Sequence, residues 1–210
     1  MVGAMPSVTR RSRSARDERR AAVEQQVLEA VERLLNEGES FTALPIQRIA
    51  EEAGMARTTF YGHFRDKPTV LMRVTATTTR ELFAGSRAWV RDDDSTLPQL
   101  EEMLFGVISG YREHGPLLRA LSEVAAYEPE VAAFWRETME VFESLLRKRL
   151  ERDQAAGRIS AELDAATTAT FVAWGLERTF AVHLETKPQA EDERFVAGVA
   201  AAMWAAMGRR

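Results

Sequence analysis

The sequence predicts an all-α fold of about nine helices in one or two domains. Apolar residues recur three or four positions apart along most of its 210 residues, which is the spacing of one face of a helix. No stretch alternates apolar and polar residues as a half-buried strand does, and no segment is repeated. Because 45% of the residues are hydrophobic, the chain can bury a sizeable core.

The composition excludes several classes of protein. The chain has no cysteine, so disulfides and thiolate metal sites are ruled out. The first twenty residues contain no apolar segment of the kind found in signal peptides. The most apolar late stretch, residues 195–207, is shorter than the roughly 18 apolar residues of a membrane span. We therefore expect a soluble cytoplasmic protein that has no membrane partner and needs no metal or other cofactor.

The N-terminal region is predicted to be a flexible basic arm over residues 1–16, followed by a helix over about 17–37. Residues 10–20 contain six arginines and two acidic residues, although the net charge of the whole chain is −4. Taken alone, such a segment indicates a solvated tail. The helix is marked by apolar residues at helical spacing, namely Val23, Val27, Ala30, Val31, Leu34 and Leu35.

A short helix and a sharp turn are predicted to follow, between residues 45 and 56. Pro45 suits the first turn of a helix, and Ile49 with Ala50 supplies an apolar face. Gly54 can adopt the positive φ that ends a helix abruptly. The chain is therefore expected to reverse direction at once.

The next segment, residues 57–64, is predicted to be a helix with two unlike sides. Phe60 and Phe64 lie on one side, while hydroxyl, imidazole and guanidinium groups lie on the other. With the preceding helix it forms a helix-turn-helix whose second helix can face a DNA groove. Asp66 can cap the following helix, which places Lys67 beside a helix N-terminus that favours a phosphate.

The run from residue 49 to residue 71 resembles the DNA-binding signature of the TetR family of bacterial regulators. The matching positions are Ile49, Ala50, Ala53, Gly54, Thr59, Phe60, Tyr61, His63, Phe64, Lys67 and Leu71. Three positions depart from the family pattern. Ala56 stands in place of a capping Ser, Thr58 in place of a common Gly or Pro, and Gly62 in place of a larger DNA-contacting residue.

The resemblance implies a helix-turn-helix DNA-binding domain over residues 17–66. Four positions match residues that contact the backbone of the duplex, namely Thr59, Tyr61, His63 and Lys67. Two positions early in the recognition helix are candidates for contacts with base edges, namely Arg57 and Thr58. Beside such a helix the basic arm becomes a candidate for phosphate or minor-groove contacts through Arg10, Arg11 and Arg13.

The remaining residues, 67–210, are predicted to form a helical ligand-binding and dimerisation domain. Thr96 and Gln99 have the spacing of a capping box, which starts a helix that His114-Gly115-Pro116 ends. The expected helices cover about 67–89, 96–114, 116–126, 129–157, 163–182 and 195–207.

Small or apolar residues occupy most sides of the last two predicted helices. Such a helix must be covered on most sides, so one side is expected to face the core and the other a second copy of the chain. A buried central helix or an alanine-rich surface would give the same pattern. We expect a homodimer, because two-fold symmetry suits two-fold DNA half-sites, and TetR proteins dimerise through their last two helices.

Large aromatic and methionine side chains are concentrated in residues 88–210. For each of them packing in a core is the simplest role, but as a set they favour a pocket for an apolar ligand. Glu177 is the best candidate for a polar group in that pocket. The candidate ligand-binding residues are Tyr111, Trp135, Met139, Phe142, Trp174, Glu177 and Trp204.

Residues 114–135 and 176–181 resemble the ethionamide-repressor branch of the TetR family. In that branch an apolar tunnel is lined by residues that match Trp135, Met139, Glu177, Trp204 and Tyr111. Two asparagines of the branch correspond to Ala173 and Leu176 here. The resemblance therefore implies a more apolar pocket in this chain.

These features predict a homodimeric regulator of transcription that binds a double-stranded DNA operator. We expect a repressor that an apolar or amphiphilic small molecule releases, by shifting the helix over 67–89 and with it the spacing of the two recognition helices. Catalysis is not expected, because the three histidines lie far apart and no nucleophile elbow or phosphate loop is present. An activator, or a helical binding module whose helix-turn-helix is only structural, remains an open alternative.

Overall fold

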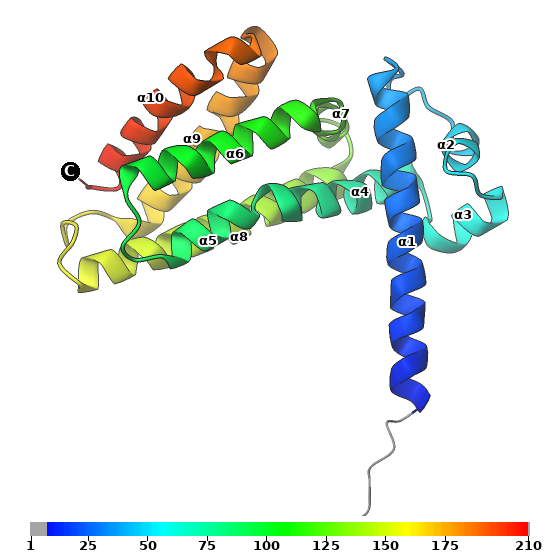
Figure 1. Ribbon diagram of the computed structural model, residues 1–210, viewed down its shortest axis with the longest axis horizontal. Helices are drawn as coiled ribbons and strands as arrows, with labels where there is room; N and C mark the ends of the chain where they lie inside the picture. Colours follow the sequence, from blue (N-terminus) through cyan, green and yellow to red (C-terminus); the bar gives the residue numbers. More distant parts are fainter. Residues whose placement is uncertain (1–7, 210) are drawn as a thin grey trace, which may run out of the picture. The chain divides into compact units, whose positions relative to one another are not determined.

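The computed structural model describes the backbone of residues 8–209 and the side chains of residues 18–209. These residues form ten α-helices and one 3₁₀ helix and contain no strand, which confirms the all-α prediction (Figure 1). The α-helices are α1 (Val8–Asn36), α2 (Ile46–Glu52), α3 (Arg57–His63), α4 (Lys67–Leu82), α5 (Ala84–Arg91), α6 (Leu97–Glu113), α7 (Gly115–Ala125), α8 (Pro129–Ala155), α9 (Ala165–Thr186) and α10 (Asp192–Ala206). The 3₁₀ helix η1 covers Gln189–Glu191. Within the described residues no helix is both long and apolar enough to cross a membrane.

The first helix is longer than the sequence predicted. It begins at Val8, although residues 1–16 were expected to be a flexible arm. The segment contains neither glycine nor proline from residue 8 to residue 36 and is rich in arginine, which has a high helix propensity. The side chains of Arg10, Arg11 and Arg13 lie outside the described residues.

The single helix expected over residues 67–89 is divided in two by Phe83. The hydrogen bonds from Phe83 N to Thr79 O (3.0 Å) and from Arg87 N to Phe83 O (3.1 Å) continue on both sides of the break. A run of β-branched threonines and Gly85 lower the helix propensity around this point. Phe83, at the break, lines a cavity described below.

The chain folds into two compact units. One contains the residues up to Thr77 together with Pro116–Val131, and the other contains Thr78–Gly115 with Ala132–Arg210. The boundary between the units therefore falls inside α4, whereas the domain boundary predicted from the sequence lies before Lys67. The chain passes between the units in α4, at the start of α7 and at the start of α8.

The first unit is held together by an apolar core between α1, α2 and α3. Phe60 and Phe64 are completely buried, with ring centroids 5.0 Å apart. Gly54 has a φ of +67°, as predicted, and so ends the segment that precedes the turn. The α7 segment belongs to this unit, where Thr42 donates a hydrogen bond to Glu123 (3.2 Å).

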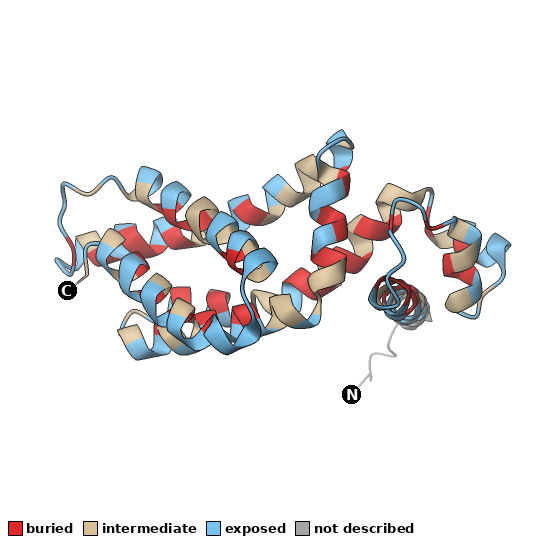
Figure 2. Cartoon of the chain, turned by 90° about the horizontal axis from the view of Figure 1, so that it is seen from above, coloured by how far each residue is buried: buried red, intermediate tan, exposed pale blue. Residues whose placement is uncertain are grey.

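The second unit is built around α6, which packs against α5, α9 and α10. Figure 2 shows buried and exposed residues on different faces of these helices, as expected for amphipathic elements. The predicted capping box starts α6, because Gln99 Oε1 accepts hydrogen bonds from Thr96 N (2.8 Å) and Oγ1 (2.9 Å). Near the other end of α6, a Cβ at Gly110 would overlap Leu82 Cδ1, so a larger residue there would require the Leu82 side chain to move.

Candidate nucleic-acid interface and ligand pocket

The recognition helix α3 has the two unlike sides that the sequence predicted. Arg57, Thr58, Thr59 and Tyr61 are exposed, and Phe60 on the opposite side is completely buried. The Arg57 guanidinium lies 5.5 Å from the centroid of the Tyr61 ring, so these two side chains form one exposed cationic and aromatic surface. His63 is half-buried at the end of the helix.

Of the three departures from the family pattern, Ala56 and Gly62 bear on the stability of α3. Ala56 occupies the N-cap position with extended backbone angles (φ −68°, ψ 145°) and makes no side-chain cap hydrogen bond. Gly62 has open space where a Cβ would point. A seven-residue helix with no side-chain cap and a glycine in its last turn has little stability of its own, so α3 depends on the core beneath it.

Lys67 lies at the start of α4 and is partly engaged by the protein. Its Nζ donates to Thr42 O (2.8 Å) and lies 5.1 Å from the centroid of the Phe41 ring, and burial lowers its pKa. Asp66 accepts a hydrogen bond from Thr69 N (2.9 Å), as a capping residue does. An ammonium group has three donors, so the contact with Thr42 leaves Lys67 able to bind a phosphate as well.

Arg73, which the sequence did not single out, supports the recognition helix from behind. Its Nη1 donates to His63 O at the end of α3 (3.0 Å) and to Glu24 Oε1 of α1 (3.0 Å). Its guanidinium also lies 5.5 Å from the centroid of the Phe64 ring. Arg73 thus fixes the C-terminal end of α3 against α1 and α4.

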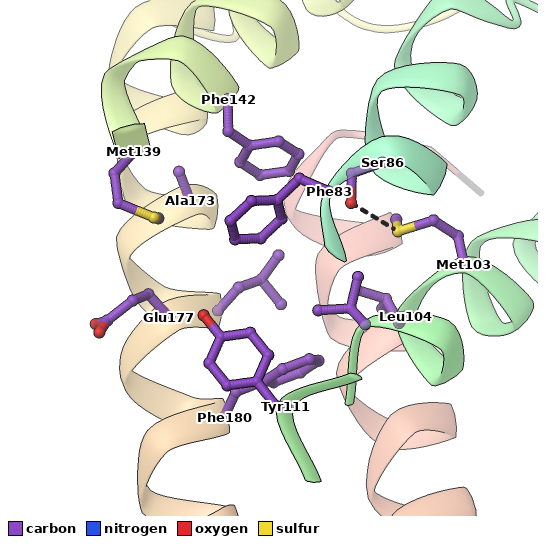
Figure 3. A pocket seen from close by; sticks show the side chains of 12 residues that line it. Phe83, Ser86, Met103, Leu104, Tyr111, Met139, Phe142, Ala173, Glu177 and Phe180 are labelled. Carbon is purple, nitrogen blue, oxygen red and sulfur yellow. Dashed lines mark hydrogen bonds between the residues drawn. The ribbon is translucent and has the colours of Figure 1, made fainter. Parts of the chain in front are cut away.

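The second unit contains a cavity between α5, α6, α8 and α9 (Figure 3). Aromatic, aliphatic and thioether side chains make most of its wall. The lining residues are Phe83, Ser86, Met103, Leu104, Val107, Tyr111, Met139, Phe142, Ala173, Leu176, Glu177 and Phe180.

Four aromatic rings are arranged in two pairs around this cavity. Phe83 and Phe142 are stacked at 6.4 Å with an interplanar angle of 24°, and Tyr111 meets Phe180 edge-on at 6.3 Å and 83°. The hydroxyl of Ser86 donates to Met103 Sδ (3.2 Å), as the dashed line in Figure 3 marks. This hydroxyl is occupied within the wall, so the wall between the rings is apolar.

The two ionisable residues among those that line the cavity are Tyr111 and Glu177. Burial raises the pKa of Glu177, against the opposing effects of Arg178 and Trp135. Burial also raises the pKa of Tyr111, and the nearby Glu177 carboxylate raises it further. In Figure 3 the Tyr111 hydroxyl points toward α9, while the Glu177 carboxylate extends away from the rings at the edge of the cavity.

The structure brings together four of the seven predicted ligand-binding residues and leaves three tryptophans outside. Tyr111, Met139, Phe142 and Glu177 line the cavity. The others do not line it. Trp135 forms a hydrogen bond with Glu177. The ring of Trp204 lies 4.8 Å from the Arg209 guanidinium. Trp174 is half-buried on α9.

The reason for this difference is rotation around each helix. Successive helical residues point about 100° apart, so Trp174 faces away from the direction of its neighbour Ala173, which does line the cavity. The lining residues Leu104, Val107 and Tyr111 share one face of α6 at spacings of three and four. That periodicity is visible in the sequence and indicates the side of α6 that faces the cavity.

Both α9 and α10 carry exposed apolar residues. Phe171 is 67% exposed and Val182 is 43% exposed, both on α9. On α10 the exposed residues include Ala197, Ala201 and Ala205, which lie one turn apart. Exposed large apolar side chains are typical of a surface that another protein covers.

Two family models match the chain. Residues 27–74 match the bacterial regulatory proteins of the TetR family, and residues 100–207 match the C-terminal domain of the transcriptional regulator EthR. The first match covers α2 and α3, and the second contains most of the residues that line the cavity.

Proteins of similar sequence or structure are transcriptional regulators. The HTH-type transcriptional regulator EthR of Mycolicibacterium smegmatis is 28% identical over 201 residues, which cover 91% of this chain and 87% of that protein. A putative TetR-family regulator from Rhodococcus sp. has a TM-score of 0.69 at 24% identity, with 91% of this chain and 99% of that chain covered. The regulator FadR from Bacillus subtilis, in complex with stearoyl-CoA, has a TM-score of 0.70 at 15% identity, with 85% and 96% covered.

The structural likenesses establish the fold, and the model of the EthR C-terminal domain spans about half of the 210 residues. Members of the family are regulators of transcription and not enzymes, and they bind DNA operators and ligands as dimers. The chain therefore belongs to the TetR family of bacterial transcriptional regulators, with an N-terminal DNA-binding domain and a ligand-binding C-terminal domain of the EthR type.

Proposed function

We propose that this regulator is a cytoplasmic repressor that holds its operator through α3 and releases it when an apolar or amphiphilic molecule occupies the cavity. The observation that carries the proposal is the division of α3 into a buried apolar side and an exposed side with cationic, hydroxyl and aromatic groups. Such a helix is suited to lie in the major groove while its core side holds it in place.

The exposed residues of α3 divide into two roles in this proposal. Arg57 and Thr58, in the first turn, read base edges, because the N-terminal end of a recognition helix meets the bases. Contacts with the phosphate backbone of the DNA are made by Thr59, Tyr61, His63 and Lys67. Arg10, Arg11 and Arg13 add contacts with phosphates or the minor groove from the N-terminal end of α1.

The dimer forms through α9 and α10 in this proposal. The exposed Phe171 and Val182 supply large apolar groups, and the exposed alanines of α10 allow close approach of a second backbone. Two copies would present two recognition helices, which suits an operator with two half-sites about one helical turn apart.

The coupling between ligand and DNA runs through continuous helices. The α4 helix starts at Lys67 and ends at Leu82, beside the lining residue Phe83, and α8 carries Met139 and Phe142. A ligand that favours one pose of α4 changes the spacing of the recognition helices. A coupling free energy of about 1–3 kcal/mol lowers the DNA affinity roughly 5–150-fold, which is sufficient for regulation. FadR in complex with stearoyl-CoA illustrates an apolar-chain ligand in this fold.

Selection of binding sites from a random pool of duplexes tests the DNA-binding part directly. Sequencing of the retained DNA should give a two-fold motif, and retention should weaken steeply with salt because phosphate contacts release counterions. A screen of apolar compounds, read by tryptophan emission, should then find molecules that release the selected operator over their own binding range. Retention that lacks both a motif and a salt dependence would instead favour a helical binding module. Increased DNA affinity on ligand binding would favour an activator.

A further inference from the structure

The ammonium group of Lys67 is held by the short loop between α1 and α2. Its Nζ donates to Thr42 O (2.8 Å) and lies 5.1 Å from the centroid of the Phe41 ring. Phe41 is only 2% exposed, so the ring under the ammonium is itself fixed in the core. A lysine side chain is long and flexible, and these two contacts restrict where its charge can lie.

The loop that carries Thr42 is in turn fixed to α7. Thr42 Oγ1 donates to Glu123 Oε1 on α7 (3.2 Å). Because a hydroxyl group has one proton, Ser40 Oγ is then the donor in its 2.7 Å contact with Thr42 Oγ1. Ser40 O also accepts hydrogen bonds from Ala43 N and Leu44 N (both 3.0 Å), which close the loop into a tight turn. The carbonyl that accepts from the lysine therefore belongs to a braced turn.

A second set of contacts fixes the residues just before Lys67. Arg65 Nε donates to Asp66 Oδ2 (2.6 Å), and Arg65 Nη2 donates to Glu130 Oε2 in the first turn of α8 (2.9 Å). Asp66 also accepts from Thr69 N (2.9 Å) at the start of α4. The backbone that carries the Lys67 side chain is thus joined to α8, as the loop is joined to α7. All of these residues lie within the first compact unit.

We propose that α7 and the first turn of α8 position Lys67 for its contact with a DNA phosphate, and that α7 acts through Thr42. This role rests on the proposed function, because it requires Lys67 to contact DNA. It goes further in making Thr42, Glu123 and Glu130 positioning residues for DNA binding. None of the three belongs to α2, α3 or the turn between them.

Positioning matters because DNA would otherwise have to order the lysine side chain. A side chain that is already ordered loses less conformational entropy on binding. Thr42 O takes one of the three N–H groups of the ammonium, and two remain for a phosphate. Burial lowers the pKa of Lys67, so its charge is incompletely solvated in the free protein. A phosphate would supply charge-assisted hydrogen bonds in place of the missing water.

A positioning role and a purely structural role differ in what DNA binding would report. If the contacts only stabilised the fold, their loss would lower the melting temperature without changing the number of phosphates bound. If they position Lys67, their loss lowers the DNA affinity and its salt dependence together, because the slope counts the phosphates that are neutralised. That loss should also disappear when Lys67 is absent.

The test measures fluorescence anisotropy of the selected operator and of a scrambled duplex with the full chain, across a range of salt. Lys67→Ala should weaken both duplexes and lower the salt slope by about one phosphate contact. Thr42→Val keeps the shape and the carbonyl of the residue but removes its hydroxyl. It should weaken both duplexes about threefold, with a smaller loss of slope. Adding Thr42→Val to Lys67→Ala should have no further effect.

Two matched variants show whether the hydroxyl itself is responsible. Thr42→Ser keeps the hydroxyl and should bind both duplexes as the wild type does. Thr186→Val removes an exposed hydroxyl from α9 in the other unit and should change neither affinity nor slope. Melting curves establish that every variant remains folded.

Paired substitutions of Glu123 test the part played by α7. Glutamine and methionine at this position both remove the charge and have similar size, but only glutamine keeps an oxygen that can accept from Thr42. Glu123→Gln should therefore bind both duplexes about threefold more tightly than Glu123→Met. The same pair at Glu130 tests the contact of α8 with Arg65. Equal affinities within both pairs would overturn the role of α7 and α8.

Other results separate this inference from the proposed function. Unchanged affinity and slope in Thr42→Val, or a loss that persists in the Lys67→Ala background, would overturn the positioning of Lys67 while leaving its DNA contact intact. An unchanged slope in Lys67→Ala would instead refute the phosphate contact on which the positioning depends. Absence of DNA binding by the wild type would contradict the proposed function itself.

Discussion

Replacement of Arg149 by methionine should strongly destabilise the second unit. Arg149 is on α8 and only 1% exposed. Its guanidinium donates to Trp89 O (3.1 Å), Asp93 O (3.2 Å) and Ser95 Oγ (3.2 Å), and it pairs with the buried Asp153 at 3.1 Å. This one side chain therefore joins α8 to the end of α5 and to the segment between α5 and α6.

The size of the effect follows from the groups left behind. Each buried acceptor without a partner costs about 1–3 kcal/mol, and breaking a buried ion pair by removing one member costs about 3–5 kcal/mol. Asp153 keeps Arg158 and Arg209 as partners, so the total should fall near the lower end, at about 3–4 kcal/mol.

Urea unfolding followed by circular dichroism, at a fixed protein concentration, measures this loss. The control is Arg147→Met, two residues earlier on the same helix, where the side chain is exposed and its nearest carboxylate, on Glu151, is 3.7 Å away. An exposed pair contributes about 0–1 kcal/mol. If the two variants differ by less than about 1 kcal/mol, the buried network does not hold this unit together as we argue.

Three further substitutions test other parts of the account. Ala56→Ser supplies the missing cap of α3 and should raise the free energy of unfolding by about 1 kcal/mol without loss of DNA binding, and no gain in urea unfolding would count against an uncapped helix. Ala201→Glu places a charge on the proposed dimer surface and should give a helical monomer in light scattering, so an unchanged dimer would locate the interface elsewhere. The pKa of Asp192 lies below its ordinary value of 3.8, chiefly because Arg112 hydrogen-bonds the carboxylate. The ionised carboxylate therefore stabilises the fold fully at a pH above 3.8, and this stabilisation is lost as the pH falls through the lowered pKa. Asp192→Asn should therefore differ from the wild type at pH 7 and approach it in acid, and a difference independent of pH would refute this assignment.

The features that the sequence predicted correctly depend on local chemistry. Gly54 adopts positive φ and Gln99 accepts from Thr96 because turn and cap preferences act over a few residues. The two sides of α3 follow from the spacing of Phe60 and Phe64 with respect to the polar residues between them. These parts of the fold and of the α3 surface can therefore be predicted without knowing which distant residues come into contact.

The features that the sequence did not predict depend on how helices pack. Arg149 and Arg73 form contacts with residues far away in the chain, and no local pattern distinguishes them from the exposed arginines. The sequence predicts a cavity from its aromatic residues, but Trp174 points elsewhere around α9, and α10, which carries Trp204, contributes no residue to the wall. Helix rotation decides which residues meet, and residue type alone does not determine it.

The central claim, that α3 reads DNA, is tested most directly by fluorescence anisotropy of the selected operator and of scrambled duplexes across a range of salt. Arg57→Ala should lower the affinity for the operator by about 1–3 kcal/mol and relax the preference at one base pair. Lys67→Ala should weaken all duplexes alike and reduce the salt slope by about one phosphate contact. Equal losses for both variants on every duplex, with unchanged salt slopes, would contradict the assignment of α3 as the element that reads the operator.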